Sequence, residues 1–284
     1  MFEWSIPSMK AIYNSRIINK ESVQISTNNR AFCYGDGLFE TIVTGPNRIN
    51  LIDGHMGRLM AHSDILKLKL PDNLTDKFKE WIKDLSTLNK ITGDVRAKIQ
   101  VWRKSGGLYS PLNHEAEFLI TVDKTEKPIF SSLPKIGIAQ SMTNQFSKVS
   151  IIKSVSALNY VMVGIEKTSQ EVDDLIILDS HGHLSETHIS NLFWTKGNQV
   201  YTPSLTSGCV SGVMRSFILD FFKNDLNQPI HEVLEGKSAL NDCDSIFSSN
   251  ASGITYFERL IERKNTLVSP EELIKPLIKR LQRP

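Results

Sequence analysis

The chain has 284 residues, of which 40% are hydrophobic and 23% are charged, and its formal net charge is +2. That composition is ordinary for a globular protein with a real core, and the length fits one large or two modest domains. No long basic run or long apolar stretch occurs, so we expect neither nucleic acid nor a membrane as a partner. Three widely spaced cysteines and a start without a signal-peptide pattern predict a cytoplasmic protein without a disulfide framework.

Residues 1–122 are expected to form a small α+β domain. Hydrophobic patterns predict two strand pairs, then two helices, then two further strands. The strands are expected at 11–18, 22–25, 40–43, 48–51, 95–102 and 117–122. The first helix is expected to begin near Asp53 as N-cap and to bury a face that includes Met60 and Ile65, and the second helix is expected over 73–88.

The segment 123–131 begins with a charged run that ends at Pro128, and it is interpreted as an interdomain linker, followed by a larger C-terminal domain over 132–284. In that domain, strands are expected to alternate with helices. The strands are predicted at 135–139, 149–152, 175–179, 191–195 and 199–201, and the helices at 157–169, 213–222 and 271–281. The predicted class is therefore α/β (α+β) with two domains.

Lys153 closes the apolar run 149–152 and precedes a predicted helix. A lysine in that position is partly desolvated, which favours the neutral amine that acts as nucleophile and base. The alternative is a lysine at a strand end whose ammonium group lies in solvent.

Glu186 follows Lys153 by 33 residues and lies just beyond a predicted turn, where an apolar strand begins. A buried carboxylate there can keep a pyridine nitrogen protonated, although a surface carboxylate is the simpler interpretation. The helix start at 211–215 has unpaired amides and a positive dipole end, which can hold a phosphate, and Arg58 can reach a phosphate with its fork of donors. A lysine, an acid and an anion-binding helix start form the set that pyridoxal 5'-phosphate (PLP) requires.

His181 and His183 flank a glycine in the predicted turn 180–183. We find no further cysteine, histidine or acid at a spacing typical of a metal site, so we expect no metal ligands in this chain.

The order and spacing of these signals resemble the class IV aminotransferase family of PLP enzymes, which have the D-amino acid and branched-chain aminotransferase fold. The resemblance covers about 28–255. It is carried by the segments 29–41, 55–59, 153–155, 173–179, 191–194, 201–203 and 212–215, together with Glu186.

The resemblance implies a role for each matching residue. Lys153 is the expected Schiff-base lysine, and Glu186 is expected to face the pyridine nitrogen. The expected phosphate ligands are Arg58, Asn250 and the amides of Val213 and Met214. The expected substrate contacts are Glu40, Arg103, Ala251 and Ser252. The resemblance also implies a small-molecule substrate, a cofactor between two domains, and a homodimer.

Within the family, the segments 102–107 and 191–203 are most similar to the 4-amino-4-deoxychorismate lyases, which release pyruvate and 4-aminobenzoate in folate biosynthesis. Other features favour an aminotransferase for a branched-chain or other amino acid. Glu40 stands where aminotransferases have glutamate and the lyases often have threonine, and the loop 106–109 lacks the arginine of the lyases. Ser156 and Ala157 also depart from the family pattern, and they are the support for a third hypothesis, a non-catalytic relative that keeps the fold.

Overall fold

The computed structural model describes residues 9–283, which divide into two compact units. Of the described residues, the first unit comprises 9–126 and Lys153–Ser156, and the second comprises Lys127–Ile152 and 157–283. The division falls after Glu126, inside the segment 123–131 that we interpreted as a linker. In the described part of the chain, no helix is long and apolar enough to span a membrane.

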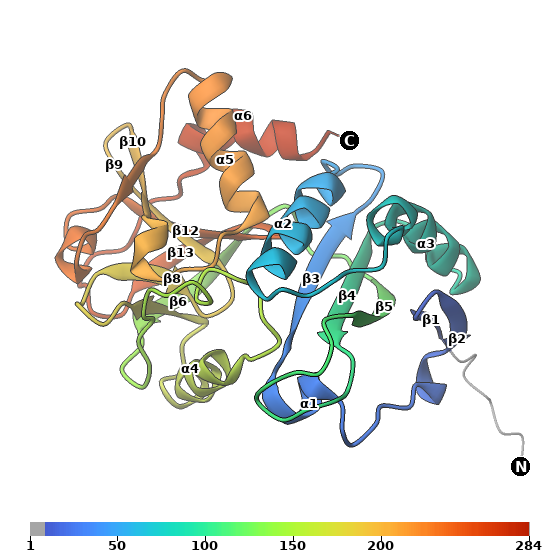
Figure 1. Cartoon of the computed structure of the whole chain (residues 1–284). Helices are drawn as coiled ribbons and strands as arrows, with labels where there is room; N and C mark the ends of the chain where they lie inside the picture. The colour runs from blue at the N-terminus through green and yellow to red at the C-terminus, as the bar shows by residue number, and fades with distance from the viewer. Residues whose placement is uncertain (1–8, 284) are drawn as a thin grey trace, which may run out of the picture. The chain divides into compact units, whose positions relative to one another are not determined.

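The first unit is built on a five-stranded antiparallel sheet in the order β2-β1-β5-β4-β3 (Figure 1). Its elements are β1 Lys10–Tyr13, β2 Arg16–Asn19, α1 Arg30–Tyr34, β3 Gly37–Thr44, α2 Ile52–Ile65, α3 Leu74–Leu88, β4 Val95–Arg103 and β5 Ala116–Lys124. Side chains of β5 alternate between buried and half-buried, so one face of the strand can meet the apolar stripe of α3. Trp81 of α3 stacks on Phe118 of β5 with ring centroids 5.4 Å apart.

The structure confirms strands near 95–102 and 117–122 and the helix near 73–88. It corrects the start of the chain. The expected strand 11–18 is instead a whole hairpin, because Asn14 and Ser15 adopt positive φ angles of 47° and 66° and reverse the chain between β1 and β2. Residues 22–25 form no strand.

A second correction concerns the partner of β3. We expected 40–43 to pair with 48–51, but no strand forms over 48–51, and β3 pairs along its whole length with the distant β4. Helix α2 begins at Ile52 with Leu51 as N-cap, so Asp53 is not the cap. Met60 and Ile65 are 51% and 39% exposed and do not belong to the buried face of α2.

The second unit is an eight-stranded mixed sheet in the order β11-β10-β9-β12-β13-β6-β7-β8. Because β8 also pairs with β9, the strands β9, β12, β13, β6, β7 and β8 form a closed ring. The elements are β6 Phe130–Ile138, α4 Leu158–Ser169, β7 Asp174–Leu178, β8 Leu184–Thr187, β9 Asn191–Lys196, β10 Gln199–Pro203, α5 Val213–Asn224, β11 His231–Val233, β12 Ser245–Asn250, β13 Gly253–Leu260 and α6 Glu271–Leu281. The three helices and the 191–201 hairpin confirm the prediction, whereas we did not predict β12 and β13.

The segment before Lys153 is a turn and not the expected strand over 149–152. The Ser147 hydroxyl accepts hydrogen bonds from the backbone amides of Val149 and Ser150, and such local bonds compete with strand pairing. Val149 is 56% exposed. Lys153 therefore does not close a buried strand.

We also expected Lys153 to belong to the C-terminal domain, but Lys153–Ser156 groups with the first unit. The backbone explains this: Phe39 N–H donates to the Lys153 carbonyl at 3.0 Å, and Val155 N–H donates to the Gly37 carbonyl at 3.1 Å. The segment is thus hydrogen-bonded to the start of β3.

Candidate active site

In the first unit, Lys153 is fixed by its backbone and rests on an aromatic ring. Its amide donates to Nδ1 of His62 at 3.2 Å, and its Nζ lies 4.5 Å from the centroid of the Phe39 ring. An ammonium group over a ring face gains a cation–π interaction, and a neutral amine there is shielded from water on one side. The structure therefore presents Lys153 as a positioned amine.

His62 holds the Lys153 amide only while Nδ1 is unprotonated, because that nitrogen must accept a hydrogen bond. Burial, with the positive charges of Arg58 and Lys153 and against the attraction of Glu40, lowers the pKa of His62 to about 4. His62 is therefore neutral at physiological pH. No pattern in the sequence indicates this role.

Glu40, on β3 of the same unit, carries a buried carboxylate whose two oxygens are both hydrogen-bonded. The residue is 1% exposed. Arg58 donates Nε to Oε1 at 2.8 Å and Nη2 to Oε2 at 2.5 Å, and His55 Nδ1 lies 2.8 Å from Oε2. Burial acts to raise the pKa of Glu40, but the bonds and charges of His55 and Arg58 hold it below its usual range. The bidentate pair fixes the orientation of the Arg58 guanidinium group.

These contacts change the interpretation of two expected roles. Glu40 was expected to contact substrate, but both of its oxygens bind side chains of α2. Glu40 therefore positions Arg58, which keeps its expected place on a helix. His55, which we quoted only as part of the motif 55–59, is the third member of this cluster.

The structure contradicts a substrate role for Arg103, whose residue is 4% exposed. Its guanidinium group binds both oxygens of Asp36, the carbonyls of Leu66 and Lys67, and Nδ1 of His114, at 2.8 to 3.3 Å. A guanidinium group has five N–H donors, and these contacts use them in holding the fold.

A second arginine, Arg30, organises the glycine-rich loop that we noted for its missing arginine. Nη1 of Arg30 donates to the carbonyls of Gly106, Gly107 and Leu108 at 3.2, 3.1 and 2.7 Å. Its Nε binds Asp36 at 2.8 Å. The loop is therefore fastened from α1 through its backbone.

In the second unit, Glu186 on β8 is 3% exposed and is held by three neutral donors. Oε1 accepts from Asn144 Nδ2 at 2.9 Å and from the Tyr160 hydroxyl at 2.7 Å, and Oε2 accepts from the Val210 amide at 3.0 Å. Neutral donors stabilise the ionised carboxylate without cancelling its charge. The arrangement suits a carboxylate that accepts a hydrogen bond from a protonated ring nitrogen.

Tyr160 and Asn144 were not among the expected site residues. Burial and the negative charge of Glu186 raise the pKa of Tyr160, so the hydroxyl remains a donor. Asn144 is 8% exposed and also donates to the Ser185 hydroxyl at 3.0 Å. Neither residue lies in a motif of the sequence. They are identified by packing alone, because α4 brings Tyr160 to β8 and the segment after β6 brings Asn144 there.

The start of α5 confirms the predicted helix near Val213 and Met214. Among the described residues, no side chain caps this N-terminus, so its first amides remain available to an anion. Gly212 at the N-cap leaves room for Asn191, because a Cβ there would lie 1.9 Å from Oδ1 of Asn191 and would displace that side chain. Asn191 in turn donates Nδ2 to the Val210 carbonyl at 2.8 Å, so one residue fixes the chain that leads into the helix.

Asn250, Ala251 and Ser252 lie at the turn between β12 and β13. Asn250 Nδ2 donates to the Ser190 hydroxyl at 2.9 Å, and its Oδ1 accepts from the Ser252 amide at 2.8 Å. The Asn250 side chain therefore shapes this turn, and Ala251 is half-buried within it.

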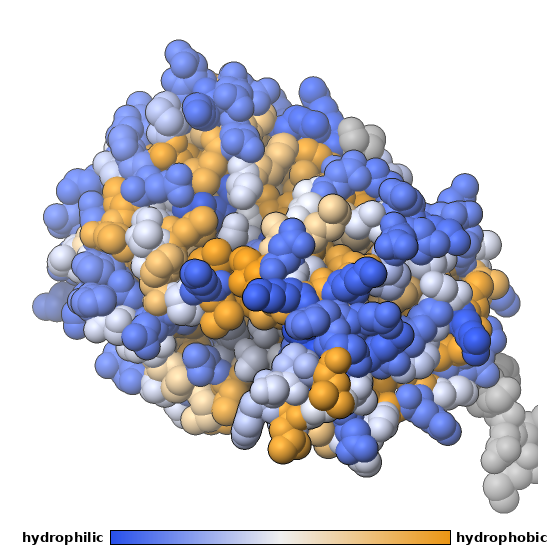
Figure 2. Space-filling model, in the orientation of Figure 1, coloured by the Kyte–Doolittle hydropathy of each residue, from blue (hydrophilic) through white to orange (hydrophobic). Residues whose placement is uncertain are grey.

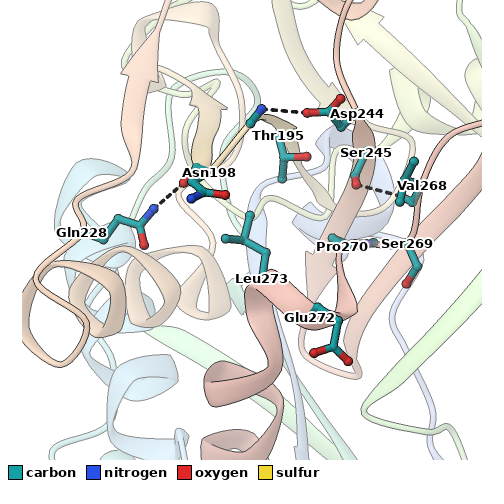
Figure 3. Close-up of a pocket in the computed structure, with 11 residues that line it drawn as sticks. Thr195, Asn198, Gln228, Asp244, Ser245, Val268, Ser269, Pro270, Glu272 and Leu273 are labelled. Atoms are coloured by element: carbon teal, nitrogen blue, oxygen red, sulfur yellow. Dashed lines mark hydrogen bonds between the residues drawn. The ribbon is translucent and has the colours of Figure 1, made fainter.

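A pocket of ≈ 460 Å³ also lies in the second unit, but it contains none of these residues (Figure 3). The Asp244 carboxylate there accepts the Gly197 amide at 2.7 Å, and the Ser245 hydroxyl donates to the Val268 carbonyl at 2.7 Å. Its polar groups thus bind each other around the ends of β9 and β12, and we assign the pocket no catalytic role.

Comparison with known proteins shows the family of the chain. Residues 37–257 match the family model described as amino-transferase class IV. The chain is 27% identical to the aminodeoxychorismate lyase of Vibrio harveyi over 203 residues, which cover 69% of this chain and 73% of the relative. It is 29% identical to the aminodeoxychorismate lyase of Bacillus subtilis over 215 residues, which cover 74% and 73%.

The fold is similar to that of the branched-chain amino acid aminotransferase of Escherichia coli, with a TM-score of 0.86, 18% identity, and coverage of 97% and 95% of the two chains. The chain belongs to the class IV aminotransferase family, and it is accordingly a PLP-dependent enzyme. The predicted fold class and cofactor are confirmed, and the hypothesis of a non-catalytic relative is not retained.

Proposed function

We propose that this enzyme is an aminodeoxychorismate lyase that releases pyruvate and 4-aminobenzoate, a reaction of folate biosynthesis in the cytoplasm. The observation that carries the proposal is the similarity to two lyases of that name, each covering about two thirds or more of both chains. The substrate is a small molecule with an amine that can exchange with Lys153 on the cofactor.

The resemblance to the family assigns residues of this chain to three groups of PLP. Lys153 supplies the amine for the aldehyde. Glu186 supplies a fixed carboxylate for the ring nitrogen, and Tyr160 and Asn144 hold it in place. Arg58 and the uncapped start of α5, with the amides of Val213 and Met214, supply the groups for the phosphate, and Asn250 adds to them.

Bound PLP supplies a ring that accepts the electron pair left when a bond to the amine-bearing carbon of the substrate breaks. The amine of Lys153 would act as the base that removes the proton from that carbon. Glu186 would lie opposite the ring nitrogen of bound PLP, and the donors of Asn144, Tyr160 and Val210 would hold its carboxylate in place. Ala251 and Ser252 are the proposed substrate contacts of the second unit.

An aminotransferase that acts on a branched-chain or other amino acid is the second candidate. It is favoured by Glu40, which is buried and bonded to Arg58 and His55 where a lyase often has threonine. In that enzyme Lys153 would both remove and return a proton, and the product would be a keto acid.

We also infer that the enzyme is a homodimer. Helix α4 exposes an apolar stripe at helical spacing: Leu158, Val161, Met162 and Ile165 are 69%, 53%, 39% and 59% exposed. Figure 2 shows hydrophobic residues at the surface in the region of α4. A stripe of this kind is typical of a surface that packs against another protein. Light scattering should give twice the 32.0 kDa chain mass, and Val161→Glu with Ile165→Glu should give the monomer mass.

A product assay on purified protein with added PLP tests the main proposal. One reaction receives aminodeoxychorismate, and another receives an amino acid panel with 2-oxoglutarate. Equal release of pyruvate and 4-aminobenzoate, lost in Lys153→Ala and kept in the exposed-lysine control Lys148→Ala, is expected. Glutamate formation without pyruvate would establish the aminotransferase, and a product in neither reaction would refute both.

A further inference from the structure

A second cluster of functional side chains lies in the β7–β8 turn of the second unit. Asp179, His181 and His183 each place a ligand-type atom within 4.8 Å of the other two. We expected no metal here from spacing, but that judgement overlooked Asp179, two residues before His181. None of these three side chains takes part in the proposed reaction.

The turn is organised around the Asp179 carboxylate, which is 6% exposed. Its Oδ1 accepts the backbone amides of His181 and His183, each at 2.8 Å. The Asp179 amide donates to the His183 carbonyl at 2.7 Å, and Gly182 supplies the φ of +87° that the reversal requires. The backbone that presents both imidazoles is therefore held in one conformation.

The other carboxylate oxygen faces the ligands. Oδ2 of Asp179 lies 2.9 Å from Nδ1 of His183, and the two imidazole rings lie with centroids 6.0 Å apart at 30°. Two ligands of a tetrahedral zinc ion at about 2.0–2.1 Å are separated by roughly 3.3 Å, so this pair is already near the required distance. His181 is exposed, so its ring can rotate to complete the set.

We propose that Asp179, His181 and His183 form a surface site for a divalent transition metal of the zinc class. Two imidazole nitrogens and one carboxylate oxygen are a donor set that suits Zn²⁺, whereas Ca²⁺ and Mg²⁺ prefer oxygen ligands. The three side chains leave a fourth position for water. Each ligand comes from one five-residue turn, so binding needs no rearrangement of the fold.

Metal in this site ties the end of β7 to the start of β8. Strand β8 begins directly after His183 and carries Glu186 three residues further on. Binding to the folded chain alone raises its stability by mass action, so the metal strengthens the turn that leads to Glu186. The site is independent of the substrate and of the reaction proposed above.

The test is titration of tag-free, full-length protein with Zn²⁺ in competition with a chromophoric chelator. One equivalent of Zn²⁺ is expected to bind to wild type, with Mg²⁺ unable to displace it. His181→Ala and His183→Ala should each weaken the affinity on the order of tenfold or more, and the double variant should lose binding. The thermal midpoint should rise with Zn²⁺ in wild type and stay constant in the double variant.

His231→Ala is the matched control, because His231 is an exposed histidine of the same unit and lies 2.8 Å from Gln199. It should bind Zn²⁺ as wild type does. Circular dichroism of each variant verifies that loss of binding is not loss of fold. Equal Zn²⁺ affinity in wild type and the double variant, or no binding by wild type, would overturn the assignment.

Discussion

Replacing His62 by asparagine should remove much of the acid sensitivity of the first unit. His62 has a pKa of about 4 in the folded chain, against the ordinary value of 6.5. As the pH falls below 6.5, the unfolded chain takes up a proton that the folded chain does not accept until about pH 4. The folded state therefore loses stability over that window and regains none of it at lower pH.

The size of the effect follows from the two pKa values. Between pH 7 and pH 5, one such histidine costs about 2 kcal/mol of unfolding free energy, and the full loss below pH 4 is about 3 kcal/mol. The side chain is 5% exposed, so solvent screening is weak. Asparagine places an acceptor oxygen near the position of Nδ1 and cannot titrate, so it retains the hydrogen bond from Lys153 N–H.

Urea unfolding of wild type and His62→Asn at both pH values measures the difference. The variant should lose about 2 kcal/mol less than wild type between pH 7 and pH 5. His231→Asn, at an exposed histidine, should lose as much as wild type. An NMR titration of His62 in the folded protein should have its midpoint near 4. Parallel pH dependence in wild type and His62→Asn, or a midpoint near 6.5, would refute the reasoning.

Three further changes test the contacts that support the site. Glu40→Gln removes the buried charge that pairs with the Arg58 guanidinium group and should lower the unfolding free energy by about 3 kcal/mol. The control Asp53→Asn, at an exposed pair with Lys79, should cost below about 1 kcal/mol in the same urea experiment. Tyr160→Phe removes a hydrogen-bond donor from the Glu186 carboxylate and should lower the unfolding free energy by about 1.5–3 kcal/mol. It should also weaken PLP binding measured by fluorescence. A loss no larger than that of the exposed control Tyr109→Phe would contradict this contact. Gly35→Ala brings a Cβ to 2.8 Å from Cβ of Ser156, whereas the control Gly197→Ala has a similar φ and no neighbour within 4 Å. Gly35→Ala should therefore be the more destabilising by about 1–3 kcal/mol. Equal thermal midpoints of the two variants would be the contrary result.

Much of the molecule was predictable because its signals are local. The helix over 73–88 and the hairpin 191–201 follow from apolar spacing and turn residues within a few positions of each other. The family and cofactor were predictable because Lys153, Glu186 and the helix start at Val213 keep a characteristic order along the chain.

The errors arise where other hydrogen bonds override the hydrophobic pattern, and those bonds come from neighbouring residues in one case and from a distant strand in another. The apolar run before Lys153 reads as a strand, but Ser147 closes it into a turn. Strand β3 has an apparent neighbour at 48–51, yet it pairs with β4, more than fifty residues away. Pairing of this kind depends on the whole sheet and is not encoded in either strand alone.

The sequence by itself determined the family and its cofactor and predicted Lys153 as the Schiff-base lysine, because each depends on residue types in a fixed order. Only the tertiary structure decided what surrounds them. In the folded chain, the Arg103 guanidinium group binds Asp36 and not substrate. His62 accepts a hydrogen bond from the Lys153 amide, and Tyr160 donates one to Glu186. A charged or polar group acts according to the partners within a few ångströms, and folding chooses those partners from residues far apart in the chain.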